Sequence, residues 1–103
     1  MELGIVVTDD RFLPQVGALF DAATRRGCVP LCFLTDTGVR LLNDPGFVAR
    51  AQAHPNRITL CEHSVERLGA ENFDLQALAD VVVVGGQYQD AELVRTCDKV
   101  LVF

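Results

Sequence analysis

Short apolar segments alternate with amphipathic segments along the whole of this 103-residue chain, and this alternation constrains its fold more than any other feature. The segments at 3–8 and 81–84 do not alternate between apolar and polar residues, as a half-exposed strand would. Continuous apolar segments of this kind are typical of strands covered on both faces. Strands that alternate with helices predict a parallel sheet with right-handed crossovers. We therefore expect one α/β domain over residues 1–103, a three-layer α/β/α structure with a five-stranded, mainly parallel, doubly wound sheet of flavodoxin-like type. The expected strands are residues 3–8, 28–34, 58–61, 81–84 and 99–103.

The segments between these strands carry helical patterns and helix signals. Asp9 and Asp10 offer an N-cap, and Leu13, Val16 and Phe20 then recur at helical spacing. Shorter helical pieces are expected near residues 39–42, 45–54, 64–68, 75–79 and 90–97.

Two features indicate where strands lie in the sheet. Pro30 cannot donate a hydrogen bond to a neighbouring strand, so we expect the strand at 28–34 at a sheet edge. The segment 81–84 has no polar face, so we expect it inside the sheet. The sequence leaves the order and direction of the last strand open.

Composition and charge exclude several classes of partner. The formal net charge is -5 and the nine Lys and Arg residues are scattered, so nucleic acid and anionic membranes are poor candidates. No apolar run approaches the roughly 20 residues of a membrane span. The first residues lack the basic region and the long apolar stretch of a signal peptide. We therefore expect a cytoplasmic protein.

Self-association is expected from the size and the hydrophobic content. A chain of this length buries only about two-thirds of its unfolded surface by itself. Because 50% of the residues are hydrophobic, apolar side chains remain to be covered. With Pro30 expected on an edge strand, open-ended sheet pairing is disfavoured. A closed homo-oligomer, a trimer or a hexamer, follows most simply.

The four cysteines are expected to be free thiols. Cys28 and Cys32 lie four residues apart on an expected strand, which separates them by roughly 13 Å, beyond the reach of a disulfide. There is no CxxC, and His54 and His63 do not pair with cysteines at zinc-finger spacing. Free thiols suit a reducing compartment, and we expect no disulfide and no metal site.

Cys61 stands where the apolar segment 58–60 stops and a helical pattern begins. At such a junction the first turn of the helix directs unpaired N–H groups at the sulfur, and the positive end of the helix dipole favours thiolate over thiol. Ligand sites in open α/β sheets also cluster at the carboxyl ends of the strands. The alternative is that Cys61 is a small buried hydrophobic residue, as free cysteines often are.

The residues that follow Cys61 are candidates to assist it. His63 could supply positive charge to a thiolate and Arg67 could bind anionic sulfur, so we take Cys61, His63 and Arg67 as candidate catalytic residues. Glu62 acts against the thiolate, because a carboxylate raises the pKa of a thiol by repulsion.

Three other loops are expected to meet Cys61 at the carboxyl ends of the strands. They supply the candidate ligand-binding residues Asp9, Thr35, Gly85 and Gly86. Each of these residues also has an ordinary role, because aspartates cap helices and glycines form turns.

Other protein classes share this strand–loop–helix layout. Cys61 and Arg67 have the C-x5-R spacing of phosphate-cradle phosphatases and arsenate reductases. Such a cradle normally has a loop glycine, whereas the intervening residues include two glutamates and no glycine, so this class is less favoured. A phospho-accepting receiver domain would need an aspartate where Cys61 stands. No GxGxxG supports a dinucleotide or flavin binder.

Three segments, in their order along the chain, resemble the DsrE/DsrF-like sulfur-relay family, which includes the TusD type. Residues 5–8, followed by a helix and then by residues 33–39, resemble the first βαβ unit of the family. Residues 61–69 resemble its cysteine motif, C-x5-R-x-G, at the entrance to a helix. Residues 97–103 resemble its terminal strand, and the three segments together span nearly the whole chain.

The resemblance implies a compact α/β/α domain that assembles into trimers or hexamers. It also implies a cysteine, here Cys61, that receives sulfane sulfur as a persulfide and hands it to a partner protein. Sulfur donor and acceptor proteins are therefore the expected partners, and this chemistry requires no cofactor or metal. Some relatives lack the cysteine, so a non-catalytic structural subunit or a small-ligand-binding module is the alternative.

Overall fold

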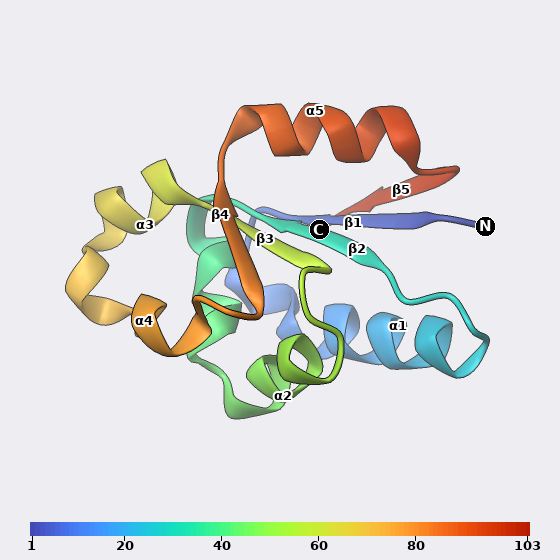
Figure 1. Ribbon diagram of the computed structural model, residues 1–103, viewed down its shortest axis with the longest axis horizontal. Helices are drawn as coiled ribbons and strands as arrows, with labels where there is room; N and C mark the ends of the chain where they lie inside the picture. Colours follow the sequence, from blue (N-terminus) through green and yellow to red (C-terminus); the bar gives the residue numbers. More distant parts are fainter.

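The computed structural model describes residues 1–103, which are organised around a five-stranded sheet whose strands are all parallel (Figure 1). The strands lie in the order β4-β3-β2-β1-β5. The expected α/β class is confirmed, and the sheet is wholly rather than mainly parallel. The strands are β1 (Leu3–Val7), β2 (Leu31–Leu34), β3 (Ile58–Cys61), β4 (Val82–Gly85) and β5 (Lys99–Val102).

Helices cover the two faces of the sheet unequally (Figure 1). From β1 to β4 the chain steps across the sheet in one direction, and it then returns past β1 to form β5. Because crossovers are right-handed, the reversal places α5 alone on one face, opposite α1, α2 and α4. The helices are α1 (Leu13–Arg25), α2 (Pro45–Ala53), α3 (Glu62–Leu68), α4 (Leu75–Leu78) and α5 (Gln87–Thr96), with 3-10 segments η1 (Asp10–Phe12), η2 (Asp36–Asn43) and η3 (Ala70–Asn72).

Local sequence signals explain where several helices begin. The side chains of Asp44 and Asp74 accept hydrogen bonds from the backbone N–H groups of Phe47 and Ala77, at 2.9 and 3.1 Å. Pro45 occupies the first turn of α2, where its missing N–H costs nothing. None of the helices combines the length and the apolar character that crossing a bilayer requires.

The sheet separates two apolar clusters of unequal size. The larger cluster lies on the side of α1 and α2, and its fully buried members include Ile5, Phe20, Leu34, Phe47 and Leu60. The smaller one lies on the α5 side and consists of Val6, Phe33, Cys61 and Leu93. Because side chains alternate along a strand, β3 contributes Leu60 to the first cluster and Cys61 to the second.

The expected edge position of the second strand is wrong. β2 is the central strand, paired with β1 on one side and with β3 on the other. The strand begins at Leu31, so Pro30 precedes the ladder and breaks no hydrogen bond in it. Cys28 also lies outside the strand, in contrast to our expectation.

The expected interior position of the fourth strand is also wrong. β4 pairs only with β3 and forms an edge, where the side chain of Val84 is 45% exposed. An apolar segment indicates burial of the strand faces, but the position in the sheet depends on the direction of the crossovers. Those directions are set by tertiary packing, which the composition of one strand does not reveal.

The close approach of η2 to β1 gives a first prediction, on stability. A Cβ on Gly38 would overlap the Val7 backbone carbonyl, which cannot rotate away. We expect Gly38→Ala to lower the free energy of unfolding by about 1–3 kcal/mol, the usual cost of overpacking. The exposed Arg40 in the same segment provides a matched control, because Arg40→Ala is expected to change it by less than about 0.5 kcal/mol. Urea denaturation measures both values, and equal losses would contradict the proposed contact.

Candidate functional site

Cys61 is the last residue of β3 and the N-cap residue of α3. β3 is an interior strand, but its pairing with β2 ends at Leu60, so at Cys61 the register continues only on the β4 side. In the register with β4, Cys61 lies opposite Gly85. The Cys61 side chain is 5% exposed and packs in the small cluster on the α5 side of the sheet.

Ser64 is the polar side chain that organises the surroundings of Cys61. It lies in the first turn of α3 and is only 4% exposed. The Asp36 backbone N–H donates to the Ser64 hydroxyl oxygen at 2.8 Å, and the Thr35 hydroxyl lies 3.3 Å from the same oxygen. Because that oxygen already accepts from Asp36, the Ser64 hydroxyl proton is available to donate to the Cys61 sulfur.

The surroundings of Cys61 favour its thiolate form. Burial raises the pKa of the Cys61 thiol, but hydrogen bonds from the Ser64 hydroxyl and N–H, the Thr35 hydroxyl and the His63 N–H more than offset it. The pKa of Cys61 therefore lies below its ordinary value. The opposite holds for Cys32, where burial raises the pKa to about 12, and for Cys97, where burial again raises the pKa.

Arg67 and Asp36 form an ion pair beside this network. The Arg67 guanidinium donates to the Asp36 carboxylate at 2.6 Å, and this hydrogen bond lowers the pKa of Asp36. Asp36 also has a φ of 50°, in the left-handed region that non-glycine residues rarely adopt. The ion pair thus helps to hold a strained residue whose N–H is needed by Ser64.

The remaining candidate residues lie at different distances from the sulfur. Thr35 and the backbone N–H of His63 both contribute to the lowered pKa of Cys61, while the His63 side chain is exposed. Asp9 lies apart: it follows β1, accepts from the Arg11 N–H at 3.0 Å and caps η1. The structure therefore brings Thr35 and His63 to Cys61, but not Asp9.

Gly85 and Gly86 connect Cys61 to α5. A Cβ on Gly85, opposite Cys61, would lie 2.5 Å from Oε1 of Gln89, so the absence of a side chain admits Gln89. Gly86 is the N-cap residue of α5, and its N–H donates to the same oxygen at 2.8 Å. The two glycines thus position Gln89 beside the Cys61 strand end.

Sequence reasoning missed Ser64 and Asp36. The spacing Cys61-x-x-Ser64 carried a signal, because a residue three positions after an N-cap lies one turn along and beside it. Asp36 carried no such signal, since its contribution is a backbone N–H from the loop after another strand.

Cys61, Arg67 and the residues between them do not form a phosphate cradle. Residues 62–68 are helical, so no anion-binding loop separates Cys61 from Arg67, whose guanidinium is bound to Asp36. No group of three or more His, Cys, Asp or Glu side chains is arranged to hold a metal ion.

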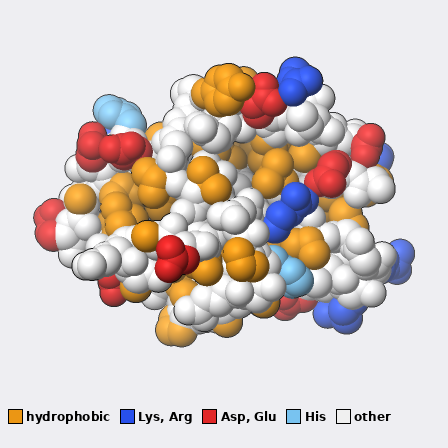
Figure 2. Space-filling view, viewed as in Figure 1, with side chains coloured by type: hydrophobic (Ala, Val, Ile, Leu, Met, Phe, Trp, Pro, Cys, Tyr) orange, Lys and Arg blue, Asp and Glu red, His pale blue; other side chains and the backbone are white.

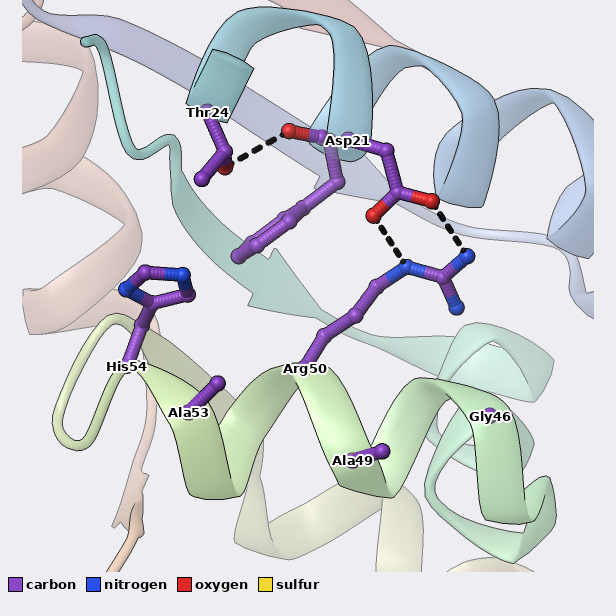
Figure 3. Close-up of a pocket in the computed structure, with 8 residues that line it drawn as sticks. Asp21, Thr24, Gly46, Ala49, Arg50, Ala53 and His54 are labelled. Carbon is purple, nitrogen blue, oxygen red and sulfur yellow. Dashed lines mark hydrogen bonds and ion pairs between the residues drawn. The ribbon is translucent and has the colours of Figure 1, made fainter.

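A cavity of about 320 Å³ on the other side of the sheet, between α1 and α2, lacks comparable chemistry (Figure 3). Its central pair is Asp21 and Arg50, joined by two hydrogen bonds of 2.8 and 2.9 Å. The Thr24 hydroxyl donates to the Phe20 carbonyl, and the His54 ring lies against the Phe20 ring. The paired charges and the absence of a thiol make this hollow a structural feature of the helix packing.

The wholly parallel sheet and the helices on its two faces define a three-layer α/β protein of flavodoxin-like type. Among solved structures, the chain is similar to the ychN protein from E. coli, a protein with a DsrE-like fold, with a TM-score of 0.68 over 100% of both chains. The two sequences are 17% identical, so this likeness shows the fold alone. No protein-family model and no curated protein sequence matches the chain.

The hydrogen bond from Ser64 gives a second prediction. We expect Ser64→Ala to raise the pKa of the Cys61 thiol, because it removes a donor to the thiolate and leaves burial unopposed. His63→Ala is the matched control, since its backbone N–H remains and the pKa is expected to stay near that of the wild type. The pH dependence of Cys61 alkylation, followed by peptide mass mapping, measures both. A larger rise in His63→Ala than in Ser64→Ala would show that side-chain charge governs the thiol.

Proposed function

We propose that Cys61 carries sulfane sulfur as a persulfide, in a relay between a donor and an acceptor thiol. The observation that supports this proposal is the set of hydrogen bonds that lowers the pKa of Cys61 at the carboxyl end of an interior strand. The thiolate, rather than the thiol, attacks sulfur–sulfur bonds. The DsrE-like fold of the structural neighbour agrees with the resemblance of residues 61–69 to the sulfur-relay family.

The transfer consists of two displacement steps. The Cys61 thiolate attacks the outer sulfur of a donor persulfide, a bond forms between them, and the donor leaves as a thiolate with the electron pair of the broken bond. An acceptor thiolate then attacks the same outer sulfur, and Cys61 leaves as a thiolate. The hydrogen bonds that stabilise the Cys61 thiolate also make it a better leaving group in the second step.

We assign distinct roles to the neighbouring residues. Ser64 and Thr35 donate to the sulfur through their hydroxyl groups. His63 assists through its N–H, and its exposed ring is available to an approaching partner protein. Arg67 acts as a positioning residue, because its ion pair holds Asp36, whose N–H donates to Ser64.

A closed homo-oligomer, a trimer or a hexamer, is part of the same proposal. The sheet has two edges, and both carry exposed apolar side chains: Val84 on β4 is 45% exposed, and Leu101 and Val102 on β5 are 43% and 67% exposed. Contact between copies at these edges would cover apolar surface and unpaired backbone groups. Sulfur donor and acceptor proteins remain the proposed partners of the assembly.

A second candidate function is that of a non-catalytic subunit or a small-ligand-binding module. The observation that favours it is the 5% exposure of Cys61, which restricts access of another protein to the sulfur.

The third prediction tests sulfur loading. After incubation with a persulfide donor, intact-mass analysis of the wild type is expected to show a gain of one sulfur atom. Cys61→Ser is expected to abolish this gain, because it removes the attacking thiolate. Cys97→Ser is the matched control, since Cys97 belongs to the same apolar region but has a raised pKa, and it is expected to load like the wild type. A gain that persists in Cys61→Ser would overturn the assignment.

The fourth prediction concerns self-association. Light scattering is expected to give a mass that is a multiple of 11.3 kDa across a dilution series. Val102→Glu at the β5 edge is expected to shift the protein towards the monomer, because it places a charge in the proposed contact. Val94→Glu is the matched control on α5, where the wild-type side chain is 57% exposed. A monomeric mass for the wild type at every concentration would contradict a closed oligomer.

A further inference from the structure

A second cavity, of about 230 Å³, lies on the α5 side of the sheet. Its floor is formed by side chains of β2, β3 and β4, and its wall by one side of α5. The cavity exists because α5 is the only helix on this face and does not cover it fully (Figure 1). Figure 2 shows hydrophobic side chains gathered below α5 on the face towards the viewer. The lining combines the apolar residues Leu31, Phe33, Val83 and Leu93 with the polar residues Thr59, Gln89, Glu92 and Thr96.

Thr59 is the residue that marks this cavity as a binding site. It lies on the cavity floor and is only 7% exposed, and it is one of just two buried polar residues in the chain. The other, Ser64, is hydrogen-bonded within the protein, whereas the Thr59 hydroxyl has no such bond and is not fully enclosed. A ligand in the cavity could therefore supply a hydrogen-bond partner for this hydroxyl.

The cavity adjoins Cys61. Thr59 and Cys61 are two residues apart on β3, so their side chains lie on the same face of the sheet, with about 6–7 Å between their Cα atoms. Phe33 and Leu93 line the cavity and also belong to the cluster that contains Cys61. Gln89, whose flexible side chain lies over Gly85 opposite Cys61, forms the end of the cavity nearest the sulfur.

The lining selects the chemistry of the ligand. The volume of the cavity corresponds to about eight water molecules, at about 30 Å³ each, which is enough for a small organic molecule. The only charged lining residue is Glu92, whose carboxylate accepts hydrogen bonds from Arg95 on the outside of α5. An anionic ligand would therefore find no cation in the lining to pair with, because Arg95 lies outside it and is already paired with Glu92. An uncharged ligand with an apolar body and one hydrogen-bonding group would satisfy the walls and Thr59.

We propose that this cavity binds the organic part R of a small persulfide, R–S–SH, in which R is uncharged, and presents the outer sulfur to Cys61. The inference rests on the proposed function and names the class of its sulfur donor. The Cys61 thiolate forms a bond to the outer sulfur, the S–S bond of the donor breaks, and its electron pair leaves on R–S⁻. The proton stays on the transferred sulfur, so the products are the Cys61 persulfide and one free thiolate.

The first arm of the test measures binding without transfer. Mercaptopropanol, an uncharged thiol with one hydroxyl, is titrated into isotope-labelled Cys61→Ser protein while backbone NMR signals are followed. We expect saturable shifts confined to residues around Thr59, Val83 and Leu93. Mercaptopropionate, of the same length but anionic, is expected to bind at least tenfold more weakly because of Glu92.

Two variants and a matched control locate the binding. Val83→Phe fills the cavity and Thr59→Val removes the hydroxyl at nearly constant volume, so both are expected to weaken mercaptopropanol binding, the first at least tenfold. Val94→Phe is the control, because Val94 follows the lining residue Leu93 on α5, is 57% exposed and does not line the cavity. Thr59→Val keeps the test decisive if Val83→Phe fails to fold.

The second arm measures transfer in the otherwise wild-type protein. Hydroxypropyl persulfide is expected to load Cys61 at least tenfold more slowly in Val83→Phe than in Val94→Phe, by intact mass. Equal loading of the two variants, or unselective binding in the first arm, would overturn the ligand site and leave the proposed function standing. Specific binding without loading of Cys61 by any donor would overturn the proposed function and leave the ligand site.

Discussion

The hydrogen bond from the Asp36 N–H to the Ser64 hydroxyl, 2.8 Å long, joins the segments that follow two neighbouring strands, and the chemistry proposed for Cys61 depends on it. Because the Ser64 oxygen accepts this bond, the Ser64 hydroxyl proton remains available to donate to the Cys61 sulfur. The backbone of Asp36 adopts a left-handed conformation to make this bond, and the Arg67 ion pair holds it there. A strained residue, a buried serine and a surface ion pair thus act together on one thiol.

The unequal covering of the sheet follows from the reversal of the chain after β4. Three crossovers in one direction place α1 and α2 on one face, where the larger apolar cluster forms. The single return places only α5 on the other face, with the smaller cluster that includes Cys61. One helix does not fill this face of the sheet, so a cavity remains near Cys61. The return of the chain from β4 to β5 therefore leaves a cavity on the same face of the sheet as Cys61.

The fold was predictable because it follows from local signals, whereas the strand order was not. Apolar segments and helix caps located nearly every element, and Cys61 was correctly placed at the end of an interior strand. Pro30 misled the prediction because β2 begins just after it, a boundary that composition does not mark. Ser64 and Asp36 were missed because their bond joins positions 28 residues apart in sequence. Such contacts depend on the sheet, which brings the loops together.

Cys61 is buried and yet the pKa of its thiol is lowered, and for the proposed relay this combination favours a small donor. Burial by itself raises the pKa of a thiol, as it does at Cys32, so a buried thiolate requires fixed hydrogen-bond donors. Those donors come from packed elements that an approaching protein would have to displace. A small molecule in the neighbouring cavity approaches along the sheet face and leaves the Ser64 network intact. In the proposed relay, transfer to an acceptor protein would then require only that the outer sulfur, one bond beyond the Cys61 sulfur, reaches the surface.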